Sequence, residues 1–187
     1  MIQEKEDLEK ALSSLIQNGY VRLEWLAQPH LDQLHKALRH RPHFVHFIGH
    51  GSFNSDQNES ELLFEDRVGR LVRVSARKFA MLLKDSLVRF VFLNTCGSGF
   101  VPSGIAETLV RRGVLAALGM SALVPDTVAI TFARGFYEAL SENYSVEAAL
   151  VEGRKAIVIS SINYNPDRPD WAHPVLYTRA ADGRLFR

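Results

Sequence analysis

The chain contains two residue types that can perform acyl transfer together, and each stands at the end of an apolar segment. His50 ends the run FVHFIGH and is followed by Gly51, and Cys96 ends the run RFVFLNTC and is followed by another glycine. A thiol becomes a good nucleophile when a neighbouring imidazole takes its proton or lowers its pKa. The resulting imidazolium can then protonate a leaving amine. If His50 and Cys96 are adjacent, they can hydrolyse a peptide bond.

The two apolar segments have the composition of buried strands, rich in β-branched and aromatic residues and bounded by proline and glycine. The chain between them is long enough for one crossover connection, so we expect parallel neighbours. Their carboxyl ends then meet at the sheet edge where open α/β sheets bind ligands. We expect the backbone N–H groups of Gly51 and Cys96 in turns at this edge, where they are candidates for stabilising an oxyanion.

The 187 residues, 47% hydrophobic and 23% charged, are typical of one globular domain spanning residues 1–187. Alternating strand and helix patterns predict an α/β fold with a largely parallel sheet covered by helices on both faces. Further strands are expected at residues 20–26, 61–65, 71–74, 114–118 and 174–178. Helices are expected at residues 4–18, 103–112 and 127–141. Three more are expected: one after Pro29 that carries Leu31, Leu34 and Leu38, one after Ser75 as N-cap, and one after Ser145 as N-cap that ends at Ile159. Residues 52–60 are polar and are expected to form a loop.

Composition excludes several functional classes. A net charge of +1 gives no support for a nucleic-acid or membrane partner. A single cysteine excludes an intramolecular disulfide and fits a reducing, cytoplasmic setting. The first residues do not resemble a signal peptide, and no apolar run reaches transmembrane length. The spacing of His30, His35 and His40 turns them around a helix axis, so neither a metal site nor a cofactor is expected.

Several short motifs in order resemble the CHAT domain, the bacterial branch of the caspase-like cysteine peptidases related to caspases and separases. They are HFVHFIGHGSF, LLFEDRVGRLV, VFLNTCGSG, GIAETLVRRGVLAALG and DWAHPVLY, and the resemblance covers roughly residues 20–179. It implies a caspase-like three-layer sandwich with His50 as base and Cys96 as nucleophile of a cysteine endopeptidase that acts on proteins. It also implies regulation by a fused or partner domain such as tetratricopeptide repeats.

The resemblance also implies where the substrate side chain before the cut is bound. In this family, the segment after the strand that follows the cysteine lines the main specificity pocket, which here places Ala122, Leu123 and Asp126 in it. Asn94 matches the glutamine of the caspase Gln-Ala-Cys motif. An uncharged, apolar substrate residue is therefore expected before the scissile bond. Asp126 follows a proline before a helical pattern and is equally a candidate N-cap.

Three alternatives remain open from the sequence. Cys96 can be a packed free thiol and His50 a structural histidine, in which case the chain is a protease-shaped interaction or regulatory module without turnover. His46 shares a strand face with His50 and is expected to be a hydrogen-bonded neighbour rather than a metal ligand. The family's sheet begins with a strand upstream of the first helix, whereas this chain opens with the helix. We therefore expect either the C-terminal portion of a larger protein or a shortened domain, and we expect the isolated chain to be weakly active or latent.

Overall fold

The computed structural model describes residues 2–26, 30–96, 103–161 and 168–185, and these confirm the predicted α/β class. The chain divides into two compact units. The sheet unit comprises residues 25–123 and 175–179, and the helical unit comprises residues 1–24, 124–174 and 180–187. None of the described helices is long and apolar enough to cross a lipid bilayer.

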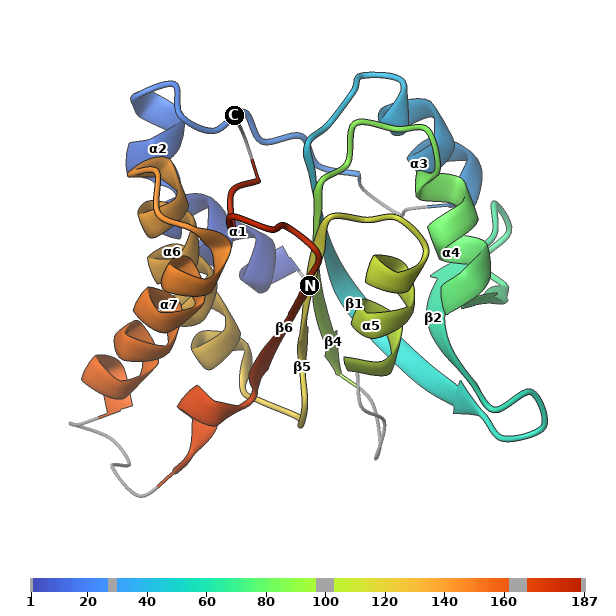
Figure 1. Cartoon of the computed structure of the whole chain (residues 1–187). Helices are drawn as coiled ribbons and strands as arrows, with labels where there is room; N and C mark the ends of the chain where they lie inside the picture. Colours follow the sequence, from blue (N-terminus) through green and yellow to red (C-terminus); the bar gives the residue numbers. More distant parts are fainter. Residues whose placement is uncertain (1, 27–29, 97–102, 162–167, 186–187) are drawn as a thin grey trace. The chain divides into compact units, whose positions relative to one another are not determined.

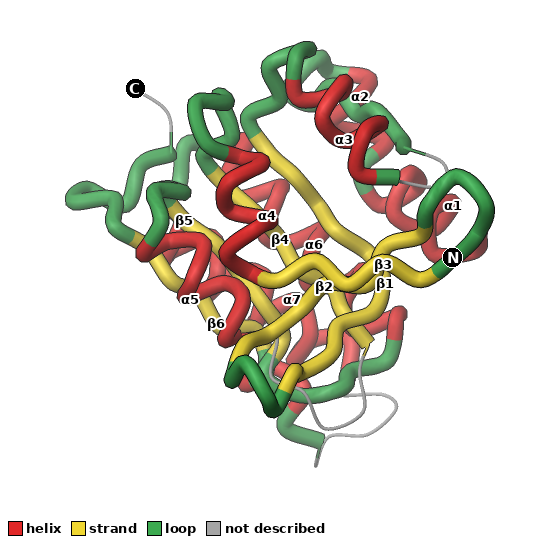
Figure 2. Tube along the Cα trace, turned by 90° about the vertical axis from the view of Figure 1, so that its right-hand side faces the viewer, coloured by secondary structure: helices red, strands yellow, loops and turns green. Residues whose placement is uncertain are grey.

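The described strands of the sheet unit form one six-stranded sheet with the order β3-β2-β1-β4-β5-β6 (Figure 2). They are β1 (Phe44–Asn54), β2 (Glu59–Glu65), β3 (Leu71–Ser75), β4 (Phe90–Cys96), β5 (Ala116–Met120) and β6 (Pro174–Thr178). β1 pairs in parallel with β4, and β4 pairs in parallel with β5. β2 is antiparallel to both β1 and β3. The centre of the sheet is therefore parallel, as expected, and the β2–β3 side is antiparallel.

The prediction of a loop at residues 52–60 is wrong. β1 continues to Asn54, and β2 already begins at Glu59, so most of this segment is a β-hairpin (Figure 1). The turn is held by the side chain of Asn54, whose Oδ1 accepts hydrogen bonds from the N–H groups of Asp56 and Gln57 at 3.1 Å each. Asn58 has a φ of 48°, which asparagine tolerates well. The polar residues predicted a loop, but here they pair with one another across the strands.

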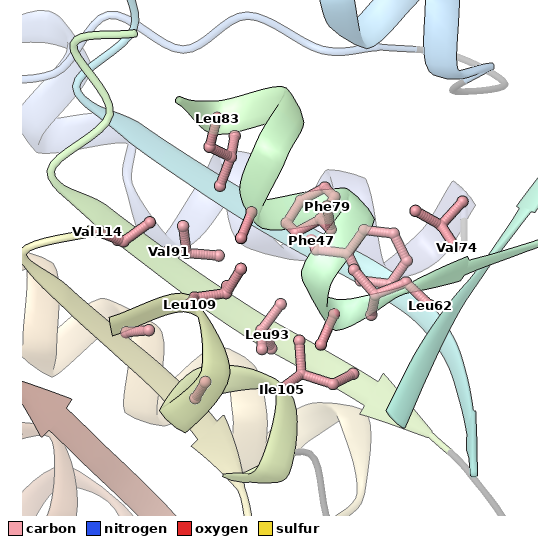
Figure 3. Packing of buried hydrophobic residues seen from close by; sticks show 14 of the residues in the cluster. Phe47, Leu62, Val74, Phe79, Leu83, Val91, Leu93, Ile105, Leu109 and Val114 are labelled. Atoms are coloured by element: carbon pink, nitrogen blue, oxygen red, sulfur yellow. The ribbon is translucent and has the colours of Figure 1, made fainter. Parts of the chain in front are cut away.

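One face of the sheet packs against α3 (Leu31–Leu38), α4 (Ala76–Leu83) and α5 (Ser103–Arg111) of the same unit. Alternate strand residues such as Phe47, Leu62 and Leu93 point into this core, where they meet Phe79 of α4 and Ile105 of α5 (Figure 3). The predicted cap of α4 is confirmed because the Ser75 hydroxyl accepts a hydrogen bond from the Lys78 N–H at 3.3 Å. This packing fixes the positions of β1 and β4, which carry His50 and Cys96.

The helical unit contains α1 (Ile2–Ala11), α2 (Ser13–Gln17), α6 (Asp126–Ser141), α7 (Val146–Ser161) and the 3₁₀ turn η1 (Asp170–Ala172). The helix expected at residues 4–18 is interrupted at Leu12, and Gly19 ends it with a φ of 74°, as predicted for a C′ glycine. α6 and α7 pack so closely that a Cβ on Gly153 would lie 2.7 Å from a ring carbon of Phe132. Asp126 is the first residue of α6, and its cap position is occupied by Pro125.

The prediction of a strand at residues 20–26 is also wrong, because the backbone of this segment is irregular. Its alternating apolar and charged residues indicated a half-buried strand. The backbone N–H groups of Tyr20 and Val21 instead donate to the carbonyl of Leu15 in α2. A strand requires a neighbouring backbone to complete its hydrogen bonds, and alternation alone does not supply one.

Candidate active site

The parallel ladder between β1 and β4 brings the backbones of His50 and Cys96 side by side. Its register runs from Phe44 opposite Phe90 to His50 opposite Cys96, the last residue of β4. Neighbouring strands lie about 4.8 Å apart, so the two residues are within the reach of one side chain. The sequence supports this arrangement because Phe90 and Phe92 are completely buried and hold β4 in the middle of the sheet.

His50 is exposed, whereas Phe47 in the same strand is buried in the core. Strand alternation puts His50 on the sheet face that carries His46, opposite the face that packs against α4. An imidazole in this position can exchange protons with a bound substrate. Chemically, an exposed base next to the cysteine backbone position is suited to acyl transfer.

His46 lies on the same face of β1 as His50, but it is unsuited to proton transfer. Its ring stacks on Phe92, with centroids 4.3 Å apart and an interplanar angle of 15°. Burial lowers the pKa of His46 to about 3, so this histidine is neutral at physiological pH. His46 therefore adds an uncharged ring on the sheet face of His50, and of these two histidines only His50 is exposed.

Gly51 does not lie in a turn, contrary to expectation. It is a buried residue inside β1, which continues to Asn54 because the polar hairpin extends the strand. Gly51 is also the first residue of β1 beyond the register partner of Cys96. The glycines that follow Cys96 in the sequence lie outside the described residues.

The residues expected to bind substrate occupy three different places. Ala122 and Leu123 follow β5, which is parallel to β4 and ends at the same sheet edge, and Leu123 is 66% exposed. Asn94 lies within β4, opposite Ile48, and is only 6% exposed. Asp126 belongs to the helical unit, where it begins α6. The structure thus brings Ala122 and Leu123 to the edge that carries His50 and Cys96, with Asn94 buried in the strand below.

The structure also shows a polar network on the hairpin that the sequence interpretation missed. The carboxylate of Glu61 accepts hydrogen bonds from Ser52 Oγ at 3.3 Å and Asn54 Nδ2 at 3.2 Å. Arg73 Nη1 lies 3.5 Å from the same carboxylate and donates to Ser52 Oγ at 2.9 Å. The signal was the period-two spacing of polar residues at positions 52, 54, 59 and 61, which indicates a polar strand face.

Metal-binding side chains do not cluster in the part of the chain that the structure describes, where no three or more histidine, cysteine, aspartate or glutamate residues are placed to hold an ion. His30, which caps α3, has its Nδ1 2.9 Å from the carbonyl of Glu65. This contact of His30 joins the start of α3 to the end of β2.

Comparison with known proteins agrees with the order of the motifs. None of the curated proteins matches the chain. The family model of the CHAT domain matches residues 3–179, which is nearly the whole chain and includes His50 and Cys96. The chain therefore belongs to the CHAT domain family, a family of caspase-like proteins.

Proposed function

We propose that the chain is a cysteine endopeptidase that hydrolyses peptide bonds in protein substrates with His50 and Cys96 as its catalytic dyad. The observation that carries this proposal is the register of β1 and β4, which makes these two residues direct neighbours. The exposure of His50 and the family membership support it further.

The chemistry follows from the two residues. His50 takes the thiol proton of Cys96, and the thiolate sulfur attacks the substrate carbonyl carbon to form a tetrahedral oxyanion. Backbone N–H groups, with those of Gly51 and Cys96 as candidates, stabilise the negative oxygen. The C–N bond then breaks as His50 gives its proton to the leaving amine. A water molecule, deprotonated by His50, hydrolyses the thioester and restores the thiol.

The substrate residue before the scissile bond contacts the segment after β5. Leu123 presents an exposed apolar side chain there, and a leucine offers no partner to a basic or acidic group. The proposal assigns Ala122, which precedes Leu123 in the chain, and Asn94, which is buried within β4, to the same contact. Together these residues favour an uncharged, apolar side chain before the cut.

Regulation by a fused or partner domain, such as tetratricopeptide repeats, is part of the proposal. A partner that binds only the competent conformation would increase the population of that conformation. A catalytic cysteine must stay reduced, so the proposed setting is the cytoplasm. The proposed partner classes are therefore protein substrates and a regulatory protein domain.

A library of quenched fluorescent peptides with varied residues before the cut tests the proposal. We expect slow hydrolysis by the chain, and its loss in Cys96→Ala and in His50→Ala. His43→Ala is the matched control, because His43 is an exposed histidine just before the amino end of β1. Binding of peptides without any Cys96-dependent hydrolysis would favour the alternative, an interaction or regulatory module.

A further inference from the structure

Arg73 lies in the same row of the sheet as His50. His50 is the register partner of Leu63 in β2, and Leu63 is the register partner of Arg73 in β3. Directly opposite residues of neighbouring strands share a sheet face. Arg73 is therefore on the face of His50, two strands away from it.

Residues of the β1–β2 hairpin contact the guanidinium of Arg73, and the Glu61 carboxylate that pairs with this guanidinium is buried. The side chain of Glu61 is 7% exposed, whereas that of Arg73 is 55% exposed. Arg73 Nη1 donates to Ser52 Oγ at 2.9 Å, and Ser52 is two residues after His50 in β1. The guanidinium is thereby drawn from β3 toward the strand of His50. The Arg73 guanidinium therefore faces solvent, and the Glu61 carboxylate is the buried partner of the pair.

The guanidinium keeps capacity for a further ligand. Its contacts with Ser52 and Glu61 both use Nη1, which leaves Nε and Nη2 without an acceptor among the described residues. An arginine fork can donate two parallel hydrogen bonds to a carboxylate. Both oxygens of Glu61 already have partners, Asn54 on Oε1 and Ser52 and Arg73 on Oε2, and the Glu61 side chain is only 7% exposed, so the exposed groups at this place are the donors of Arg73.

The strand order determines which part of a substrate passes Arg73. The order β5-β4-β1-β2-β3 puts Leu123 after β5 on one side of Cys96, and puts His50 and Arg73 on the other side. If Leu123 contacts the residue before the cut and His50 protonates the leaving amine, the residues after the cut lie over β1 and β2. The distance from β1 to β3 is two strand spacings of about 4.8 Å each, which an extended substrate covers with about three residues. The side chain of Arg73 extends toward β1 and so shortens this distance.

We propose that Arg73 binds an acidic side chain of the substrate, two or three residues after the scissile bond, and so selects substrates on the leaving-group side. This inference rests on the proposed peptidase function, whose orientation of substrate it uses. The preferred substrate class is a protein segment with an apolar residue before the cut and aspartate or glutamate shortly after it.

Two peptides that differ only in glutamate or glutamine at these positions test the inference. Wild-type protein should cleave the glutamate peptide about two- to fivefold faster in kcat/KM, the size expected for a half-exposed ion pair. Arg73→Glu should reverse this ratio, Arg73→Gln should bring it to one, and higher salt should reduce it. Arg70→Glu is the matched control and should keep the wild-type ratio, because Arg70 is an exposed arginine in the turn before the first residue of β3.

A binding measurement separates this inference from the proposed function. Cys96→Ala protein is titrated with fluorescent forms of both peptides, and anisotropy gives the two dissociation constants. Tighter binding of the glutamate peptide that is lost with an added Arg73→Gln supports the inference, even if no peptide is ever cleaved. Absence of cleavage by the wild type counts against the peptidase function alone. Equal cleavage or equal binding of the two peptides by protein with Arg73 intact overturns the role of Arg73.

Discussion

The Cα atom of His50 is paired with the Cα atom of Cys96 at the end of the parallel ladder that joins β1 to β4. Because the pairing is a property of the sheet, both residues are placed by the core under the sheet rather than by flexible loops. Shifting the register by one residue would move His50 to the opposite face of β1. The catalytic hypothesis therefore depends on the packing of residues that never contact a substrate.

The first prediction is that His50 and Cys96 act as one unit. His50→Ala should lower kcat/KM for a peptide substrate by roughly 10²- to 10⁴-fold, as expected when a general base is lost. Cys96→Ala removes the nucleophile itself and should lower kcat/KM at least as much. The double variant should be little worse than either single variant, because both residues serve the same step. The check is peptide hydrolysis under single-turnover conditions. Undiminished cleavage by Cys96→Ala would rule out the protease hypothesis.

A second prediction concerns Leu123, which is 66% exposed after β5. Leu123→Asp should lower kcat/KM for peptides with leucine before the cut by roughly tenfold, because an apolar contact is replaced by a charge. Val68→Asp is the control, since Val68 is 70% exposed but lies in the β2–β3 turn. Peptide-library profiling gives the preference directly. A strict wild-type requirement for arginine, lysine or aspartate before the cut would disprove the role of Leu123.

The third prediction follows from His46, whose Nε2 is buried and whose pKa is lowered to about 3 by burial. An unfolded histidine has a pKa near 6.5, so below that pH the unfolded chain binds a proton that the folded chain does not. The contribution of neutral His46 to the free energy of unfolding should therefore be at its maximum above about pH 6.5. It should fall toward pH 3 by up to about 1.4 kcal/mol per pH unit from this residue.

Urea titrations at pH 6.5 and pH 5 check this prediction. His46→Phe keeps an aromatic ring next to Phe92 and should lose about 1.6 kcal/mol less than the wild type over this interval. Equal pH dependence of the wild type and His46→Phe would show that His46 is protonated in the folded protein.

A fourth prediction tests the core that positions β1. Phe79 of α4 is fully buried and lies against Phe64, with ring centroids 6.2 Å apart. Phe79→Ala should lower the free energy of unfolding by about 3–5 kcal/mol because it leaves a cavity. Met81→Ala in the same helix is the control, since Met81 is 69% exposed and should cost less than about 0.5 kcal/mol. Urea unfolding followed by circular dichroism measures both, and a small effect of Phe79→Ala would contradict this description of the core.

The strands β4 and β5 could be predicted from the sequence because their apolar runs are buried on both faces, whereas in the run of β1 that leads to His50 only Phe47 is buried. The segments around His50 and Cys96 allow few alternatives once Phe90, Val91, Phe92 and Leu93 are all fully buried. The adjacency of the two residues then followed from parallel pairing and one crossover connection. Burial is a strong local signal, and it specified the part of the fold that carries the proposed site.

The hairpin and its network could not be predicted in the same way. Ser52, Asn54 and Glu61 are polar, and their mutual hydrogen bonds depend on a pairing that no short segment reveals. Residues 20–26 show the opposite error, because alternation there indicated a strand although the described sheet provides no neighbour. Tertiary hydrogen bonding decided both segments, and local patterns contain little information about it.

The most direct test of the dyad is covalent labelling by a peptide with an apolar residue before a thiol-directed electrophile. Intact mass spectrometry gives the rate, and peptide mapping gives the site. We expect single labelling at Cys96, slowed strongly in His50→Ala and unchanged in His43→Ala at neutral pH. Labelling of Cys96 at the same rate with and without His50, or no labelling of the folded protein, would contradict the account of His50 and Cys96 as a catalytic pair.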